Sequence, residues 1–323
     1  MSNSSIRLAV PRTLLYYRYF PLWESFFNEL GVSVETSKPS SADILSRGSK
    51  YAHTDSCLPI KLAFGHVDSL FDSQNDYLFL PRFFRLENKS FVCPKVIGFT
   101  DMVRCCVYPQ RSGVAETKAP YLIDNLFDIH NHSNEKVFRD IGRHFTSNYL
   151  KINRAYSSGV KYHKFLSDKR SSIFRGEILK RFKMKIGVIG HPYNIHDDYI
   201  NMGVLKELNR LDALGVTYED MPSDGFECDL SGFPSGLFWS FGREIYRTAM
   251  YFMSGLDFKM DGLIYLAPFG CGLDSILVYI IQNEARARNI PFLNLTLDEH
   301  SAKAGILTRL EAFIDMLSCG RGE

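Results

Sequence analysis

The sequence carries almost no net charge, because 38 lysines and arginines face 36 aspartates and glutamates. A formal charge of +2 gives no electrostatic basis for binding nucleic acid. No apolar run approaches the length needed to cross a membrane, and residues 1–5 lack the basic and long apolar segments of a signal peptide. We therefore expect a cytoplasmic protein that binds neither nucleic acid nor a membrane.

Two sequence signatures are also missing. The chain has no Gly-x-x-x-x-Gly-Lys-Ser/Thr loop and no other recognisable ATP site. None of Cys57, Cys93 and Cys271 forms a Cys-x-x-Cys pair, so their spacing alone does not define a metal site. In a cytoplasmic protein, the seven cysteines nevertheless favour metal or redox use over a disulfide framework.

The two halves of the chain open with the same order of elements. A strand over residues 6–10 leads through a proline-bearing loop to a helix over 14–30, and a strand over 185–189 leads in the same way to a helix over 199–214. A Leu-Gly-Val follows in both halves, and its glycine is expected to end the helix. This repeat predicts two βα units, each of which begins a separate parallel sheet.

The length of 323 residues allows about two domains with real cores. We expect an α/β protein with two tandem Rossmann-like, or flavodoxin-like, domains, parallel sheets and a helical connecting segment. The expected domains span residues 1–136 and 185–323, and the connecting segment spans 137–184. That segment is basic with interleaved aromatic residues, which indicates either a solvated helical face or a docking surface for an acidic partner protein.

The second half is organised around residues 267–275, APFGCGLDS. Residues 262–266 predict a strand buried on both faces and residues 276–288 predict a helix, so Cys271 falls where a parallel strand leads into a helix. Ligands usually bind at this edge of an α/β sheet, and a helix N-terminus favours a thiolate. Cys271 is therefore a candidate metal or cluster ligand or a nucleophile, unless it is a small buried side chain.

Two further cysteines lie beside prolines at predicted element edges. Cys57 precedes a helix that begins near residue 60, and Cys93 precedes Pro94. If both sheets turn their carboxyl edges to one cleft, the sulfur atoms of Cys57, Cys93 and Cys271 can converge there. A cubane iron–sulfur cluster normally takes four cysteines, so three would leave one iron open for chemistry.

Several polar residues accompany these cysteines as site candidates. Zinc held by three thiolates would need a fourth ligand, which His66, His191 or His300 could supply. Asp298, Glu299 and His300 follow the last predicted strand. They either form an acid/base cluster or cap the final helix and hold its loop.

Two other features have simpler interpretations. Cys105 and Cys106 lie in a predicted buried strand or helix end, and we expect them to pack in the core because adjacent side chains rarely share one metal. Arg82 stands at the end of a predicted strand near Cys93. It either binds an anionic group or forms a structural ion pair.

A series of motifs runs in order through nearly the whole chain. They are residues 10–17 (VPRTLLYY), 57–61 (CLPIK), 65–67 (GHV), 92–95 (VCPK), 190–194 (GHPYN), 238–242 (FWSFG), 269–275 (FGCGLDS), 298–300 (DEH) and 308–313 (TRLEAF). Together they resemble the acyl-CoA dehydratase activase-related family. That family is similar in turn to the subunits of 2-hydroxyacyl-CoA dehydratases, such as 2-hydroxyglutaryl-CoA dehydratase, and to double-cubane cluster proteins.

The resemblance implies tandem Rossmann-like domains with an oxygen-sensitive cluster between them. In the dehydratase subunits three cysteines hold each [4Fe-4S] cluster, and by motif these correspond to Cys57, Cys93 and Cys271. A double-cubane [8Fe-9S] cluster would use the same motifs. The resemblance also implies an ATP-dependent activase protein, which must be a separate chain here because this one has no ATP site. Relatives suggest a homodimer or a related heterodimer.

The expected function is that of an iron–sulfur redox protein. It would accept low-potential electrons from the activase and reduce or dehydrate a small-molecule substrate at an open iron site, as an ATP-dependent reductase or a 2-hydroxyacyl-CoA dehydratase-like lyase. The alternative is a non-catalytic, cluster-bearing accessory or electron-transfer subunit of an acyl-CoA dehydratase or reductase system. The candidates for hydrogen bonds around the cluster or for proton delivery are His66, His191, Asp298, Glu299 and His300.

Overall fold

The computed structural model describes residues 6–111, 119–128, 133–178, 181–182, 184–221, 226–228, 230 and 237–320. The chain divides into two compact units, which we name unit 1 (Met1–Phe165) and unit 2 (Leu166–Glu323). The domain limits expected at residues 136 and 185 stay a prediction. Within the described residues, no helix has the length and apolar character to span a membrane.

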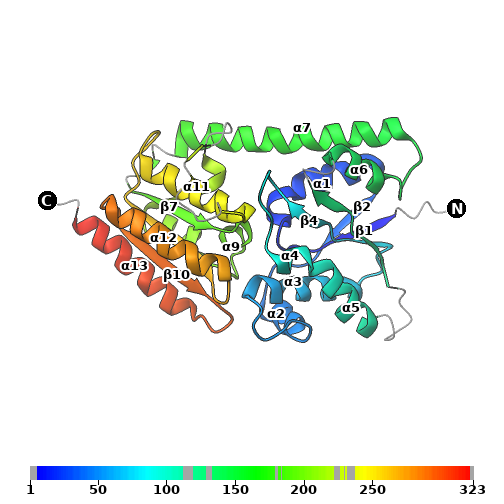
Figure 1. Cartoon of the computed structure of the whole chain (residues 1–323), viewed down its shortest axis with the longest axis horizontal. Helices are drawn as coiled ribbons and strands as arrows, with labels where there is room; N and C mark the ends of the chain where they lie inside the picture. Colours follow the sequence, from blue (N-terminus) through cyan, green and yellow to red (C-terminus); the bar gives the residue numbers. More distant parts are fainter. Residues whose placement is uncertain are drawn as a thin grey trace. The chain divides into compact units, whose positions relative to one another are not determined.

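Unit 1 is built on a four-stranded, fully parallel sheet (Figure 1). Its strands, in the order in which they pair, are β2 (Ser33–Thr36), β1 (Arg7–Val10), β3 (Tyr77–Phe79) and β5 (Tyr121–Ile123). A separate parallel pair joins β4 (Arg82–Arg85) to β6 (Leu126–Asp128). The helices that begin in this unit are α1 (Tyr16–Leu30), α2 (Ala42–Ser49), α3 (Leu58–Ser69), α4 (Pro94–Ile97), α5 (Phe99–Arg111), α6 (Asn134–Gly142) and α7 (Tyr149–Ile173).

Unit 2 repeats this architecture with a second four-stranded parallel sheet. Its strands, again in pairing order, are β10 (Phe292–Leu297), β9 (Gly262–Pro268), β7 (Met184–Gly190) and β8 (Ala213–Val216). Its helices are α9 (Pro192–His196), α10 (Val204–Arg210), α11 (Ser240–Ser254), α12 (Gly272–Ala287) and α13 (Lys303–Cys319). The boundary between the two units falls within α7, which continues as a π-helical turn over Phe174–Ile178.

The two main sheets share one topology. In each, the first strand lies between the second and the third, so the order reverses between β1 and β3 in unit 1 and between β7 and β9 in unit 2. In doubly wound sheets, ligands bind beside the carboxyl ends of the strands at this reversal point. The α/β class with parallel, flavodoxin-like sheets is therefore confirmed, and each unit has one such point.

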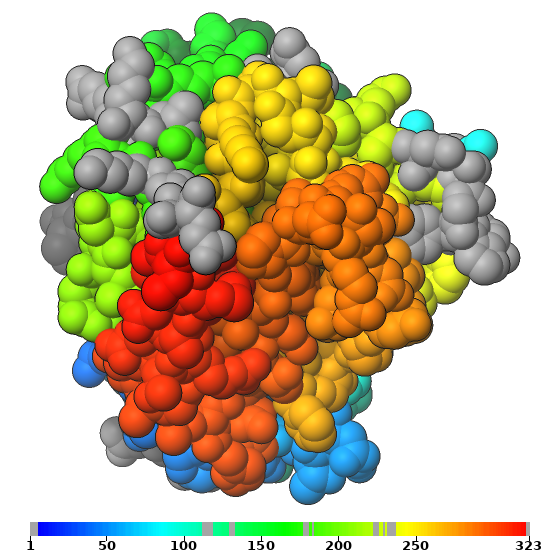
Figure 2. Space-filling view, turned by 90° about the vertical axis from the view of Figure 1, so that its left-hand side faces the viewer, coloured from blue at the N-terminus to red at the C-terminus, as the bar shows by residue number. Residues whose placement is uncertain are grey.

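Helices cover both faces of the sheet in unit 2. A Cβ atom on Gly187 of β7 would meet Phe252 of α11, whereas one on Gly262 of β9, which points to the opposite face, would meet Phe313 of α13. Every residue of β9 is buried, as its continuous apolar sequence predicts. Figure 2 shows the surface that α11, α12 and α13 form. The core beneath includes Phe252, Tyr265 and Leu277, all at most 2% exposed.

The helix expected over residues 199–214 is shorter than predicted. It spans only Val204–Arg210, and residues 213–216 instead form β8, so the glycine at position 215 lies in a strand. The chain reverses at Asp212, which adopts a φ of 56°, as Gly31 does after α1 with a φ of 84°. Gly215 serves packing instead, because a Cβ atom there would lie 2.7 Å from the Leu205 side chain.

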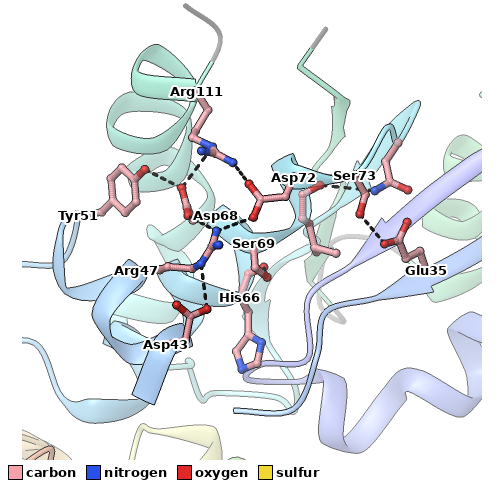
Figure 3. Close-up of polar contacts among 12 residues, drawn as sticks. Glu35, Asp43, Arg47, Tyr51, His66, Asp68, Ser69, Asp72, Ser73 and Arg111 are labelled. Carbon is pink, nitrogen blue, oxygen red and sulfur yellow. Dashed lines mark hydrogen bonds and ion pairs between the residues drawn. The ribbon is translucent and has the colours of Figure 1, made fainter. Parts of the chain in front are cut away.

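Two glycines let α2 and α3 approach closely in unit 1. A Cβ atom on Gly48 would lie 1.8 Å from the Lys61 carbonyl oxygen, and one on Gly65 would lie 1.8 Å from that of Ile44. A network of ion pairs lies at the C-terminal end of α3 (Figure 3). It joins Arg47 of α2 and Arg111 of α5 to Asp68 and Asp72. These contacts fix α3, which begins directly after Cys57.

The core packing expected of Cys105 and Cys106 is wrong. Both lie on α5, where Val103 and Val107 face the core while Cys105 is exposed and Cys106 is half-buried. The helical period of 3.6 residues explains the difference. Cys105 lies two residues from both valines and therefore faces another side of the helix, whereas Cys106 lies three residues after Val103 and is partly covered.

Candidate functional site

The three candidate cysteines share one position in the fold. Cys57, Cys93 and Cys271 are the N-cap residues of α3, α4 and α12, and none of their side chains makes a capping hydrogen bond. All three are half-buried. All seven cysteines of the chain lie among the described residues, and none of them forms a disulfide. The prediction that Cys57 and Cys271 lie at helix N-termini is therefore confirmed.

The loops that carry Cys57 and Cys93 are tied together within unit 1. The ammonium group of Lys95, two residues after Cys93, donates a 3.0 Å hydrogen bond to the carbonyl oxygen of Asp55, two residues before Cys57. Proline follows Cys93 directly and Cys57 after one residue, and both prolines lie in the first turn of their helices. A proline there loses no helical hydrogen bond, which favours a defined helix start.

The backbone of unit 2 brings the segments of His191 and Cys271 together. Gly190 ends β7 with a φ of 153°, and a Cβ atom there would lie 2.9 Å from the Leu266 carbonyl oxygen on β9. His191 follows as the N-cap of α9. After β9, Gly270 turns the chain with a φ of 75° and places Cys271 at the start of α12. Glycine suits both positions because it tolerates a positive φ and a close approach.

His191, Cys271 and Asp274 form the central cluster of this site. One ligand atom from each lies within 4.8 Å of those of the other two, and no other set of three such ligands occurs in the described part of the chain. The Nε2 atom of His191 is 3.4 Å from Oδ2 of Asp274. The Tyr265 hydroxyl donates a 2.7 Å hydrogen bond to Oδ1 of the same carboxylate. The structure thus brings together His191 and Cys271, both predicted site residues.

The imidazole of His191 is held rigidly but lacks good hydrogen bonds. It stacks on Tyr193 at 4.9 Å between ring centroids and meets Phe241 edge-on at 5.3 Å. His191 is 2% exposed and Asp274 is 1% exposed. Among the described residues, neither ring nitrogen of His191 nor Oδ2 of Asp274 has a hydrogen-bond partner of good geometry. Such buried polar atoms are costly, and they commonly mark sites that bind an ion or act in chemistry.

Burial and close charges set the protonation states of this cluster. Burial raises the pKa of the Cys271 thiol, which His191 opposes and Asp274 reinforces. Burial also disfavours a charged His191, but Asp274 and Cys271 outweigh it and raise the pKa of the imidazole. Burial, followed by the Asp274 carboxylate, raises the pKa of Tyr265 well above its ordinary value. Without a metal Cys271 thus favours the thiol, and metal binding would displace its proton.

The donor set at the helix starts suits a thiophilic metal centre. Thiolates bind zinc and iron–sulfur clusters, and each candidate cysteine is half-buried with a sulfur atom that does not cap its helix. In unit 2 a carboxylate and an imidazole with unsatisfied atoms lie beside the sulfur of Cys271. The residues around Cys271 are therefore suited to a metal ion or cluster bound to its sulfur atom. The cluster type stays a prediction.

His66 belongs to unit 1, where it lies on α3. Its side chain is fully buried, with Nδ1 2.8 Å from the Ser37 hydroxyl and Nε2 2.9 Å from the Ser40 hydroxyl. Burial, followed by repulsion from Arg12, lowers the pKa of His66 to about 3. A neutral imidazole between two hydroxyls can orient those groups. Near neutral pH it does not carry the second ring proton and therefore has no positive charge.

The residues after β10 are arranged around a turn. Oδ1 of Asp298 accepts a 2.7 Å hydrogen bond from the His300 backbone N–H, and the Asp298 backbone N–H donates to the Ser301 hydroxyl at 2.9 Å. Glu299 and His300 are exposed. The Asp298 side chain thus holds the loop, but it does not cap α13, whose N-cap is Ala302. A catalytic role for Asp298, Glu299 or His300 stays a prediction.

Arg82 forms ion pairs within unit 1. Its guanidinium group donates two hydrogen bonds to Asp101, at 2.5 and 2.6 Å, and further ones to Asp124 at 2.8 and 3.0 Å. The two carboxylates occupy both edges of the guanidinium plane. The structural ion pair is therefore the interpretation that the geometry favours.

Sequence reasoning did not assign Asp274 and Tyr265 to the site. Asp274 lies three residues after Cys271, in the first turn of α12, where an acidic residue also suits the helix dipole. Tyr265 lies on the fully buried strand β9. A buried tyrosine needs a partner for its hydroxyl, and this requirement is the signal that could have indicated a polar group beyond the strand.

The chain matches two family models. Residues 7–221 match the CoA enzyme activase uncharacterised domain (DUF2229), and residues 251–317 match the 2-hydroxyglutaryl-CoA dehydratase D-component. No curated protein matches the chain. A solved structure of a candidate phosphosugar isomerase from Silicibacter pomeroyi aligns at 11% identity over 98% of this chain and 87% of that one. Its TM-score of 0.21 is too low to support an argument. Because the first family match spans more than half of the sequence, the chain belongs to this CoA enzyme activase domain family, and with the second match it is a member of an acyl-CoA dehydratase system.

Proposed function

We propose that the protein is an iron–sulfur redox component of this system, with Cys57, Cys93 and Cys271 as cluster ligands. In this proposal a separate ATP-dependent activase supplies low-potential electrons. When bound, a [4Fe-4S] or double-cubane [8Fe-9S] cluster with an open iron would supply the electron-transfer chemistry that reduces or dehydrates a small-molecule substrate. The working protein would be a homodimer or a related heterodimer.

One observation carries the proposal: all three cysteines occupy the N-cap of a helix, and all three fall within the matched family regions. Cys57 and Cys93 lie in residues 7–221, and Cys271 lies in the region that matches the dehydratase D-component. The exposed backbone N–H groups of a helix N-terminus favour negative charge, which suits a cluster whose charge becomes more negative on reduction.

The chain's own residues would have distinct roles around the cluster. Cys57 and Cys93 would bind iron from unit 1, where the bond from Lys95 to Asp55 keeps their loops in a fixed relation. The buried Asp274 carboxylate and the aromatic rings of Tyr193 and Phe241 would exclude water from the inner side of Cys271. Such exclusion strengthens electrostatic interactions at the metal.

The proposal is tested by anaerobic purification with iron and sulfide analysis and low-temperature electron paramagnetic resonance. We expect brown protein with about four irons per chain, a content that a double cubane shared by two chains also gives. The variants Cys57→Ala, Cys93→Ala and Cys271→Ala should lose the iron, whereas Cys105→Ala, which changes an exposed cysteine on α5, should keep it. Colourless protein that contains zinc or no metal would contradict the proposal.

The second candidate is a non-catalytic, cluster-bearing accessory or electron-transfer subunit. Many apolar side chains on α7 are exposed, among them Leu150 at 82% and Phe165 at 57%, as expected for a helix that docks on a partner protein. The two candidates differ in turnover. Reduced, iron-loaded protein that receives electrons from an activase but converts no acyl-CoA substrate would favour the accessory role.

A further inference from the structure

The sulfur of Cys271 has a buried polar neighbour that the proposed ligand set does not explain. His191 comes from a different strand end than Cys271, it is 2% exposed, and both of its ring nitrogens lack good hydrogen bonds among the described residues. An imidazole that only filled the core would leave two polar atoms unsatisfied at considerable cost. A hydrogen bond to the nearby sulfur of Cys271 would satisfy one of these two atoms.

A chain of contacts orients this imidazole. The Tyr265 hydroxyl donates to Oδ1 of Asp274, which leaves Oδ2 directed at Nε2 of His191 at 3.4 Å. Stacking on Tyr193, with an angle of 7° between the ring planes, and the edge of Phe241 prevent the ring from turning away. The sulfur of Cys271 completes the set, with one ligand atom of each of the three residues within 4.8 Å of those of the other two.

We propose that Tyr265, Asp274 and His191 form a buried positioning chain whose imidazole donates an N–H···S hydrogen bond to the Cys271 thiolate and thereby raises the reduction potential of the cluster bound there. This inference rests on the proposed function. A hydrogen bond to a cysteine ligand withdraws negative charge from the sulfur, and it stabilises the reduced state most because that state carries more negative charge.

Two substitutions of His191 separate this role from a purely structural one. His191→Phe keeps an aromatic ring against Tyr193 and Phe241 but removes the donor. His191→Gln keeps an N–H donor of similar reach. Each variant is purified anaerobically as the full chain, and its iron content and midpoint potential are measured by redox titration with electron paramagnetic resonance. We expect wild-type iron content in both, a more negative midpoint potential in His191→Phe, and a potential close to that of the wild type in His191→Gln.

Iron-loaded His191→Phe protein with an unchanged midpoint potential would overturn the inference. So would a single zinc or iron ion that stays bound to a Cys57→Ala/Cys93→Ala variant and is lost on His191→Phe substitution, because His191 would then be a metal ligand itself.

A second readout works without a cluster. In the iron-free chain, alkylation of Cys271 by iodoacetamide is followed by mass spectrometry, with the exposed Cys105 as the internal reference. We expect alkylation to be several-fold slower in His191→Phe than in the wild type, because the thiolate loses its donor. Equal alkylation rates in the two proteins would contradict the proposed hydrogen bond from His191 to the Cys271 sulfur. A wild-type chain that never binds iron, but shows the rate difference, would instead contradict the proposed function and leave the contact supported.

Discussion

The Nε2 atom of His191 lies 3.4 Å from Oδ2 of Asp274, with both side chains almost completely removed from water. The two residues come from different elements, the start of α9 and the first turn of α12, which meet because β7 and β9 pair in the sheet. Removing one partner of a buried pair leaves an uncompensated charge in the core, so the other contacts of the carboxylate matter because they restrain it. In this protein, the hydroxyl of Tyr265 supplies that restraint.

The first prediction concerns this hydroxyl. Tyr265→Phe removes the donor to Asp274 and leaves the carboxylate buried with one fewer partner, so the free energy of unfolding should fall by about 1–3 kcal/mol. The measurement is urea denaturation at neutral pH. Tyr279→Phe is the control, because Tyr279 is 67% exposed, and its effect should stay within about 0.5 kcal/mol. Equal stability of the two variants would mean that Tyr265 does not restrain Asp274.

The sequence predicted the elements that carry the cysteines. The continuous apolar run of β9, the glycines on either side of Cys271 and the apolar spacing of α12 were sufficient to place Cys271 at a helix start. Pro59 indicated the helix start after Cys57 in the same way, whereas Pro94 indicated only that Cys93 lies at the edge of an element, and the helix α4 was not predicted. These features are local, and local patterns of hydrophobicity and turn residues are what a single sequence expresses most directly.

Two other features depend on information that local patterns lack. The contact between His191 and Asp274 follows from the order in which strands pair, and periodicity does not determine that order. The end of α10 was misplaced because Asp212 adopts a positive φ, which leaves no glycine as a signal, while the nearby Gly215 is required for packing. Both differences are tertiary effects that override local preferences.

The second prediction concerns the pH dependence of stability. Burial lowers the pKa of His66 to about 3 in the folded chain, whereas its ordinary value is 6.5. Between these values the unfolded state binds the additional proton, so the contribution of His66 is complete above pH 6.5 and is lost as the pH falls towards 3. The loss amounts to about 1.4 kcal/mol for each pH unit well below 6.5.

Urea denaturation of the wild type and His66→Gln between pH 7 and pH 4 tests this prediction. The variant should be less stable at pH 7, because its amide cannot reproduce both bonds to Ser37 and Ser40. Its stability should then decline less steeply than that of the wild type as the pH falls. Parallel profiles would show that His66 is not held neutral in the folded chain.

The third prediction concerns the ion-pair network of unit 1 (Figure 3). Asp68 is 5% exposed and accepts hydrogen bonds from the Tyr51 hydroxyl at 2.7 Å and from Arg47 at 3.1 Å, with Arg111 at 3.4 Å. Asp68→Asn removes the charge from the centre of the network and should lower the free energy of unfolding by about 2 kcal/mol, measured by urea denaturation.

Asp43→Asn is the matched control for this network. Asp43 also pairs with Arg47, at 3.1 Å, but its side chain is 74% exposed, so the loss should be at most about 0.5 kcal/mol. If the two substitutions cost the same, burial would not be the property that gives Asp68 its importance.

The fourth prediction concerns the close contact that fixes α3 behind Cys57. In Gly65→Ala the new Cβ atom would lie 1.8 Å from the carbonyl oxygen of Ile44, so α2 and α3 must separate. Because the clash is with backbone and no flexible side chain can yield, we expect a loss of about 3 kcal/mol or more in the free energy of unfolding, measured by urea denaturation.

Gly305→Ala is the matched control in α13, where a Cβ atom meets nothing within 4 Å. It should stabilise the chain by up to about 1 kcal/mol, since alanine favours the helix. A Gly65→Ala protein as stable as Gly305→Ala would show that α2 does not hold α3 in place, and the position of Cys57 would then need another support.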